Sequence, residues 1–264
     1  MIISTKMREA RQEEIGIMCR RLILSKQIVD RCKEATPKQE EFIYEVLLNE
    51  LEQRAMTRKT RLLNRAKFPV LKSLTGYKFD KIRFPPSLTR EALETCDFIR
   101  EKTNIICYGE VGTGKTHLAT AIGVKACEMD IKVRFYTVTE LVLKLADSRN
   151  NGTLERLITD LKRMDLLILD EWGYVPVDKE GSQLLFRVIA DSYESKSLIL
   201  TTNLEFSKWG GIFTDQQMAA AMIDRLVHHG HLLFFDGPSH RMEHALMRKI
   251  GPSSEVKEEP VNDC

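Results

Sequence analysis

One stretch of eight residues decides the fold: Gly109-Glu110-Val111-Gly112-Thr113-Gly114-Lys115-Thr116. It has the pattern G-x-x-x-x-G-K-[ST], in which glycines let backbone N–H groups turn inward around phosphate oxygens. Residues 104–108 before it are typical of a buried strand, and residues 117–122 after it are typical of a helix. The N-terminus of that helix adds unpaired N–H groups and the positive end of the helix dipole. This context favours a phosphate-binding loop over the alternative, a chance glycine-rich turn.

The loop predicts a site for ATP and Mg²⁺. We expect Lys115 to reach the β- and γ-phosphates and the Thr116 hydroxyl to be a ligand of Mg²⁺. The residues expected to bind the nucleotide are those of the loop together with the residue that follows it: Gly109, Glu110, Val111, Gly112, Thr113, Gly114, Lys115, Thr116 and His117.

A second chemical motif ends an apolar run, Leu166-Leu167-Ile168-Leu169-Asp170-Glu171. Apolar residues at every position are typical of a strand buried on both faces of a parallel sheet. Asp170, at the carboxyl end of this strand, is predicted to hold Mg²⁺ through water beside the phosphate-binding loop. Glu171 is predicted to orient and deprotonate the attacking water. An ordinary acidic pair at a strand end is the alternative, and the preceding loop favours the catalytic interpretation.

The alternation of strands and helices predicts a doubly wound α/β fold with a five-stranded parallel sheet. The expected strands are residues 104–108, 132–138, 166–170, 197–203 and 231–235. The expected helices, apart from the one that follows the loop, are residues 87–101, 139–148, 153–163, 180–193, 215–228 and 239–249. Polar residues at the carboxyl ends of parallel strands converge on the ligand crevice. Asn203 is therefore expected to hydrogen-bond the hydrolytic water or the γ-phosphate, with a turn-forming asparagine as the alternative.

The amino-terminal third has a helical and strongly charged pattern. Helices are expected over residues 5–35 and from Pro37 onward, where proline suits the first turn. The second helix carries a basic run with almost no acids between its members: Arg54, Arg58, Lys59, Arg61, Arg65 and Lys67. Lys and Arg clustered on one element are the electrostatic footprint of a DNA-binding surface. A solvated helix face is the alternative for such a run.

These patterns predict four segments. They are a helical amino-terminal domain for DNA or partner binding (1–67), a connector (68–86), an ATPase domain (87–250) and a disordered acidic tail (251–264). The six cysteines form no C-x-x-C pair, so reduced thiols of a cytoplasmic protein are expected. The histidines between residues 228 and 244 have no cysteine or carboxylate at ligand spacing, which argues against zinc. No apolar run approaches the ~18 residues that span a membrane, so no membrane partner is expected.

These residues together resemble those of AAA+ ATPases and, within that class, the IstB-like helper ATPases of insertion sequences. The matching stretches cover nearly the whole chain: residues 68–74, the loop with residues 117–119, and residues 169–174, 201–204, 209–210, 224–226 and 239–241. The loop alone is shared by very many ATPases, whereas the combination is far more specific.

The resemblance implies roles for three further residues. Asn203 corresponds to the sensor-1 polar residue, Arg225 to the arginine finger that reaches the ATP of the next subunit, and Arg241 to the sensor-2 arginine. The family has tyrosine before this last arginine, where this chain has His240. The resemblance also implies a vestigial helical lid, double-stranded DNA and a transposase as partners, and ATP-dependent homo-oligomers that hydrolysis loosens.

Two other functions are open at this point. DnaC-type loaders of replicative helicases share most of these motifs, but they need a helicase-docking face at the amino terminus, where the basic run favours DNA. A P-loop kinase of a small molecule would also use the loop, but Asp224-Arg225 and the lack of a recognisable acceptor-binding lid argue against it. The predicted function is an ATP-hydrolysing transposition helper that assembles on target DNA and recruits and stimulates a transposase.

Overall fold

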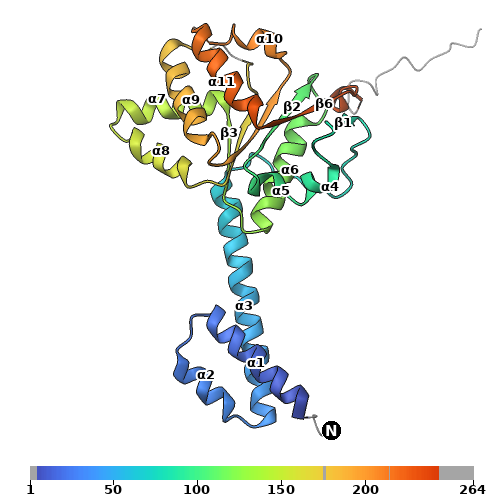
Figure 1. Cartoon of the computed structure of the whole chain (residues 1–264), viewed down its shortest axis with the longest axis vertical. Helices are drawn as coiled ribbons and strands as arrows, with labels where there is room; N and C mark the ends of the chain where they lie inside the picture. Colours follow the sequence, from blue (N-terminus) through green and yellow to red (C-terminus); the bar gives the residue numbers. More distant parts are fainter. Residues whose placement is uncertain (1–4, 175–176, 214, 244–264) are drawn as a thin grey trace, which may run out of the picture. The chain divides into compact units, whose positions relative to one another are not determined.

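The computed structural model describes residues 5–174, 177–213 and 215–243. The chain divides into two compact units, residues 1–64 and 65–264. The first consists of helices, and the second is a sheet with helices on both faces (Figure 1). None of the helices in the described ranges is long and apolar enough to cross a membrane.

The amino-terminal unit is built on three helices, α1 (Thr5–Arg21), α2 (Lys26–Lys33) and α3 (Pro37–Ala66). The continuous helix expected over residues 5–35 is wrong, because the chain turns after α1 with Ile23 in the left-handed region (φ 60°). The expected helix start at Pro37 is confirmed. There the Gln39 side-chain oxygen accepts hydrogen bonds from the backbone N–H and the hydroxyl of Thr36, at 2.9 Å each. The bond from the Thr36 N–H satisfies a donor that the helix itself leaves unpaired.

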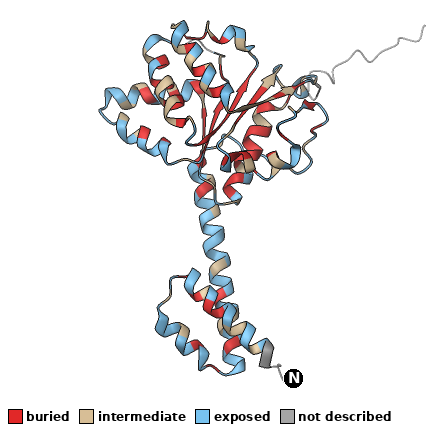
Figure 2. Ribbon diagram, in the orientation of Figure 1, coloured by how far each residue is buried: buried red, intermediate tan, exposed pale blue. Residues whose placement is uncertain are grey.

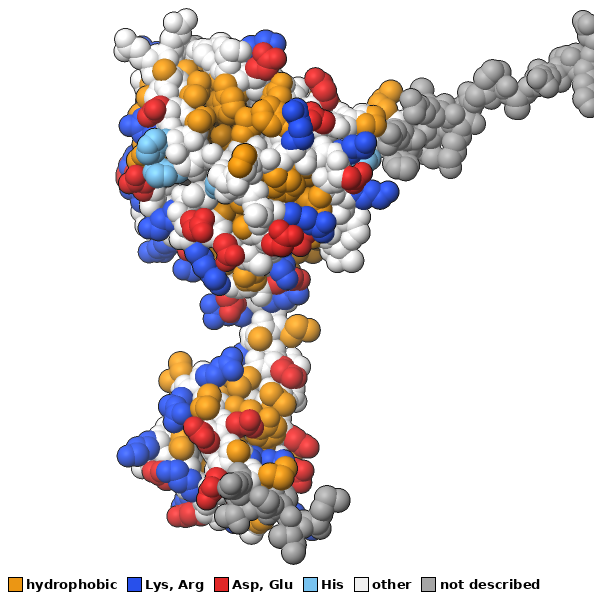
Figure 3. Space-filling view, turned by 45° about the vertical axis from the view of Figure 1, so that its right-hand side comes forward, with side chains coloured by type: hydrophobic (Ala, Val, Ile, Leu, Met, Phe, Trp, Pro, Cys, Tyr) orange, Lys and Arg blue, Asp and Glu red, His pale blue; other side chains and the backbone are white. Residues whose placement is uncertain are grey.

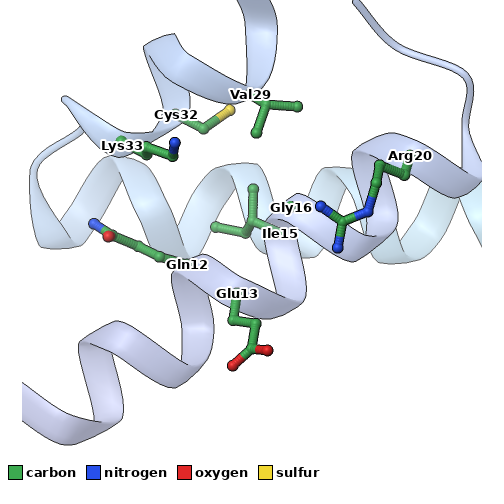
Figure 4. Close-up of a pocket in the computed structure, with 8 residues that line it drawn as sticks. All are labelled: Gln12, Glu13, Ile15, Gly16, Arg20, Val29, Cys32 and Lys33. Carbon is green, nitrogen blue, oxygen red and sulfur yellow. The ribbon is translucent and has the colours of Figure 1, made fainter. Parts of the chain in front are cut away.

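A small apolar core holds these helices together. Its buried members are Ile15, Cys19, Leu22, Cys32 and Leu47. Beside it lies a cavity of about 220 Å³, lined by Ile15, Val29 and Cys32 together with polar and charged side chains such as Gln12 and Arg20 (Figure 4). The cavity belongs to the amino-terminal unit, whereas the phosphate-binding loop belongs to the other unit.

The second unit is organised on a six-stranded sheet with the order β1-β6-β2-β5-β4-β3. Its strands are β1 (Ile82–Arg83), β2 (Asn104–Gly109), β3 (Val133–Thr137), β4 (Leu166–Asp170), β5 (Ser197–Thr202) and β6 (Gly230–Phe235). Neighbours pair in parallel, except that β1 is antiparallel to β6. The five predicted parallel strands are confirmed. β1 is not among the predicted strands, because two residues are too few to show an alternating pattern.

The helices of this unit are α4 (Arg90–Glu94), α5 (Asp97–Arg100), α6 (Lys115–Glu128), α7 (Val138–Asn150), α8 (Leu154–Lys162), α9 (Lys179–Ser192), α10 (Phe206–Trp209), α11 (Gln216–His228) and α12 (His240–Glu243). The single helix expected over residues 87–101 is instead α4 and α5, because Cys96 between them is left-handed (φ 59°). The predicted continuation of the last helix to residue 249 and the predicted disordered tail lie outside the described residues.

The sheet lies between two layers of helices. α6 covers one face, and α7, α9 and α11 cover the other (Figure 1). On the latter face, Leu167, Leu169 and Leu200 pack with fully buried helix side chains such as Leu141 and Leu185. Buried residues accordingly concentrate on the strands and on the helix faces toward them (Figure 2). Each such leucine contributes roughly 1.5–3 kcal/mol when it is removed from water, so this packing holds the helices on the sheet.

The buried thiols predict a loss of stability in alkali. Burial raises the pKa of Cys96 from 9.0 to about 11 and that of Cys127 from 9.0 to about 12. A folded thiol keeps its proton where the unfolded chain loses it, so this stabilisation is complete below the unfolded pKa and is lost as the pH rises above it. Each thiol should lower the free energy of unfolding by about 1 kcal/mol over the two pH units that straddle its unfolded pKa.

Urea unfolding under reducing conditions, at about one pH unit below and one above that pKa, checks this prediction. The Cys127→Ala protein should lose about 1 kcal/mol less than the wild type across this interval. An equal loss in the two proteins would show that Cys127 does not titrate as its burial requires.

Candidate nucleotide-binding site

The phosphate-binding loop connects the carboxyl end of β2 to the first turn of α6, as predicted. Gly112 (φ 84°) and Gly114 (φ 97°) adopt conformations that residues with a Cβ atom rarely take. A Cβ atom at Gly112 would lie 2.0 Å from the hydroxyl oxygen of Ser239, so this position has no room for a side chain. The close approach holds the start of α12 on the loop, where the His240 N–H donates to the Gly112 carbonyl at 3.0 Å.

Lys115 begins α6, and its ammonium group lies back over the loop. Its Nζ atom donates to the carbonyl oxygens of Gly109 and Glu110, at 2.7 Å each. The residue is 5% exposed, and burial lowers its pKa below the usual value. Charged phosphate oxygens are stronger partners for an ammonium group than carbonyl oxygens. A phosphate that enters the loop can therefore replace these two bonds.

Asp170 and Glu171 lie at the carboxyl end of β4, between β3 and β5 in the sheet. The Asp170 carboxylate is 4% exposed and accepts a hydrogen bond from the Thr116 hydroxyl at 2.9 Å. The hydroxyl of Thr201, at the end of β5, donates to the same oxygen, Oδ1. Glu171 is exposed and has a left-handed backbone (φ 61°). The structure thus brings Thr116 and Asp170, the two residues predicted to hold Mg²⁺, into direct contact.

The start of α12 brings a positive charge to the same place. Burial is the main cause of the lowered pKa of Lys115, and the nearby charge of Arg241 lowers it further. Burial likewise raises the pKa of Tyr174, a residue that also lies within the electrostatic reach of Glu171, Asp170 and Arg241. Because the charge of Arg241 acts on both Lys115 and Tyr174, Arg241 lies near both the loop and the acidic pair. Its side chain is exposed.

The other two residues of predicted catalytic role lie near opposite ends of the strands. Asn203 directly follows β5, and its side chain is exposed at the carboxyl edge. Arg225 lies on α11, where its guanidinium donates to the Ala221 carbonyl at 2.9 Å and lies 5.2 Å from the centroid of the Phe186 ring.

Arg225 lies near the amino end of β2, as the contact of its neighbour on α11 shows. Leu226, the next residue of α11, accepts a hydrogen bond from the Asn104 side chain at 3.2 Å. Asn104 is the first residue of β2, and the loop begins at its last residue, Gly109. This part of α11 is therefore roughly 16 Å along the strand from the loop. The structure does not bring Arg225 to the phosphate-binding loop of its own chain.

The six predicted DNA-binding residues lie on or beside α3. Arg54 pairs with Glu50 at 2.7 Å and donates to the Leu22 carbonyl at 3.3 Å, so it also contacts its own unit. Arg58, Lys59, Arg61 and Arg65 lie on the helix. Lys67 lies beyond the helix end in a left-handed conformation (φ 61°), so the expectation that one helix carries all six is wrong. Acidic and basic side chains mix on the visible surface (Figure 3).

Two residues beside the loop and the acidic pair are absent from the sequence prediction. The Tyr77 hydroxyl donates to the Gly114 carbonyl at 3.3 Å, and its ring centroid lies 5.1 Å from that of His117. Tyr77 precedes Gly114 by 37 residues, and no local pattern spans that distance. Thr201 contacts Asp170 because β5 pairs with β4. A hydroxyl residue at the end of an apolar strand is the signal that could have indicated Thr201.

Comparison with known proteins identifies the family of this site. Residues 21–247 match the family model described as IstB-like ATP binding protein. The chain belongs to the IstB-like ATP-binding family. An ATP-binding protein of insertion sequence IS21 from Pseudomonas aeruginosa is 38% identical over 192 residues, which cover 72% of this chain and 71% of that protein.

Among solved structures, DnaI shares the fold of this chain over part of its length. DnaI aligns with a TM-score of 0.52 at 18% identity, over 64% of this chain and 90% of the DnaI chain. The AMPPCP-bound DnaA of Aquifex aeolicus aligns with a TM-score of 0.47 at 23% identity, over 58% of this chain and 46% of its own. This chain thus spans less than half of that DnaA. The IstB-like protein has the mixed α/β fold with a mostly parallel sheet that its sequence predicts, and these likenesses concern the fold alone.

The site of the IstB-like protein has the donor groups that ATP and Mg²⁺ require. The positive φ values of Gly112 and Gly114 give the loop a backbone that can turn its N–H groups toward phosphate oxygens, and Lys115 supplies a positive charge within the loop. The Thr116 hydroxyl and the Asp170 carboxylate are hard oxygen donors, which Mg²⁺ prefers. Mg²⁺ commonly takes few protein ligands beside the phosphates of its substrate. The residues present therefore fit both groups.

Proposed function

We propose that this protein is an ATP-hydrolysing, DNA-binding helper that recruits and stimulates a transposase. The observation that carries the proposal is the 2.9 Å hydrogen bond between Thr116 and Asp170, because it joins the phosphate-binding loop to the acidic strand at one point. The IS21 relative, an ATP-binding protein of an insertion sequence, supports the context. The same family match supports a transposition helper over a helicase loader or a small-molecule kinase.

The residues of the site divide the work of phosphoryl transfer. Lys115 binds the β- and γ-phosphates, and Thr116 and Asp170 hold Mg²⁺, which neutralises negative charge on the transferred group. Glu171 takes a proton from the attacking water. Asn203 orients that water from the carboxyl end of β5. Arg241 contacts the γ-phosphate, since α12 is held on the loop by the bond between His240 and Gly112.

Arg225 serves the ATP of a neighbouring subunit in this proposal. Its place near the amino end of β2 supports that role, because it cannot complete the site of its own chain from there. An arginine supplied from a neighbour stabilises the charge that develops on the phosphoryl group. ATP would then join subunits into a homo-oligomer, and hydrolysis would loosen it.

Double-stranded DNA is the proposed partner of the basic residues of α3 and of Lys67. Contacts from Lys and Arg to phosphates position a protein on a duplex without reading its bases. Binding should therefore tolerate changes of sequence and respond to DNA shape. The oligomer assembled on DNA would then bind the transposase, which is the proposed protein partner.

The salt dependence of DNA binding tests this function. Each contact between a basic side chain and a phosphate contributes about −0.9 to the slope of log affinity against log salt. The Arg58→Ala/Lys59→Ala/Arg61→Ala protein should lose roughly one to three such contacts for each bound subunit, and should bind all duplexes more weakly. Fluorescence anisotropy with labelled duplexes, ATP and Mg²⁺ over a range of salt concentrations measures both effects.

A charge-matched variant provides the control. Arg149→Ala/Lys162→Ala/Arg163→Ala removes three exposed basic residues from α7, α8 and the residue after α8. Its slope should equal that of the wild type. If both triple variants flatten the slope equally, overall charge rather than α3 determines binding. If neither does, the basic residues of α3 are a solvated surface.

A further inference from the structure

Thr201 connects the two carboxylate residues of the site. Its hydroxyl donates to Asp170 Oδ1 and accepts a hydrogen bond from the backbone N–H of Glu171 at 3.1 Å. A hydroxyl has one hydrogen and two lone pairs, so it can make both bonds at once. Thr201 is 2% exposed, and none of the roles proposed above belongs to it.

The backbone of Glu171 needs such support. Its left-handed conformation (φ 61°) is unfavourable for a residue with a Cβ atom and persists only where the surroundings hold it. Two consecutive N–H groups bond to Thr201, that of Glu171 to its hydroxyl and that of Trp172 to its carbonyl oxygen at 2.8 Å. The direction in which Glu171 leaves the sheet is therefore set by β5, the neighbouring strand.

We propose that Thr201 is a positioning residue for ATP hydrolysis, which holds the Asp170 carboxylate and Glu171 at a fixed spacing. This inference rests on the proposed function. The hydroxyls of Thr116 and Thr201 both bond to Oδ1 of Asp170. The Thr116 hydroxyl can bind Mg²⁺ through a lone pair and still donate its hydrogen to Asp170, but it has no contact with Glu171. Thr201 alone of these two hydroxyls contacts both acidic residues, so it sets their spacing while Glu171 accepts the proton from water.

The next residue supplies a matched control. Thr202 is 1% exposed at the same strand end. Its hydroxyl donates to the Trp172 carbonyl at 2.8 Å and accepts from the Leu204 N–H at 3.0 Å. Successive side chains point to opposite faces of a strand, so these bonds involve neither carboxylate. Replacement of either threonine by valine removes one buried hydroxyl with two partners, and only the variant at Thr201 touches Asp170 and Glu171.

Steady-state phosphate release, measured with ATP, Mg²⁺ and duplex DNA, gives the first comparison. Thr201→Val should lower kcat by about 10–100-fold, because a catalytic group displaced by about 1 Å costs up to that much in rate. Its affinity for a fluorescent ATP analogue in EDTA should stay within about twofold of the wild type, since the loop is unchanged. Thr201→Ser should restore kcat to within about threefold, because it keeps the hydroxyl. Thr202→Val should lower the Tm as Thr201→Val does and leave kcat near that of the wild type.

Hydrogen exchange gives a second comparison that does not depend on turnover. The amide of Glu171 loses its acceptor in Thr201→Val, so a peptide that contains it should exchange faster than in the wild type, Thr201→Ser or Thr202→Val. A wild type that releases no phosphate would overturn the proposed function, and exchange would still test Thr201. Unchanged exchange in Thr201→Val, an unchanged kcat in an active protein, or a kcat in Thr201→Ser as low as in Thr201→Val would overturn the positioning role.

Discussion

The Glu171→Gln protein should bind ATP as tightly as the wild type and hydrolyse it roughly 10²–10⁴-fold more slowly. The amide keeps the size of the exposed side chain but cannot accept the proton of the attacking water. Binding should survive because Lys115 and the contact between Thr116 and Asp170 are unchanged. The stalled protein should stay assembled on DNA with ATP, which size-exclusion chromatography and DNA anisotropy can follow.

Two further variants serve as controls for the Glu171→Gln experiment. Lys115→Ala should fail to bind ATP, because the loop loses the ammonium group that now contacts Gly109 and Glu110 at 2.7 Å. Glu205→Gln removes an exposed acid from the region after β5, where it pairs weakly with Lys208 at 3.8 Å, and should behave as the wild type. Undiminished turnover by Glu171→Gln would remove Glu171 from the role of base.

The Arg225→Ala protein should bind ATP almost normally yet hydrolyse it on the order of 10³-fold or more slowly. The large effect follows from the loss of the only charge that a neighbouring subunit is proposed to bring to the transferred phosphoryl group. Arg225 also lies over the Phe186 ring and donates to the Ala221 carbonyl. A thermal melt is therefore needed to show that the variant is folded. Arg163→Ala, which removes an exposed arginine outside the site, is the control.

A mixing experiment separates a shared site from a site within one chain. Neither Lys115→Ala nor Arg225→Ala should hydrolyse ATP alone. A mixture should regain part of the activity, because Lys115 of one chain and Arg225 of another can form a complete site. If the mixture stays inactive while chromatography shows that mixed assemblies form, the site is not shared.

Local sequence predicts the loop and the five parallel strands. Glycine spacing and continuous apolar runs are local patterns, and tertiary packing does not change the loop or the strands that they predict. The breaks at Ile23 and Cys96 could not be predicted in this way. Each is a left-handed residue other than glycine, so no turn residue marks it, and only the packing of the adjoining helices selects that conformation.

The arrangement of the site depends on the order of the strands, which their alternation with helices does not specify. Thr201 meets Asp170 because β4 and β5 are neighbours, with Leu169 opposite Leu200. Tyr77 reaches the loop because the connector folds back onto it. The convergence of strand ends was enough to predict that Asp170 lies beside the loop. The contact of the Thr201 hydroxyl with Asp170 and Glu171 could not be predicted without the register of β5 against β4.

Both tryptophans of the chain lie at one point of the molecule. Trp172 follows the acidic pair directly, and its ring centroid lies 5.2 Å from that of Trp209 and 5.8 Å from that of Phe213. All of the indole emission of the protein thus originates from two neighbouring rings, and one of them, Trp172, lies on the chain segment that Thr201 holds. The protein carries its own optical reporter of that segment. We expect any movement of that segment during a single turnover to change the colour or the intensity of the intrinsic fluorescence of the unlabelled molecule.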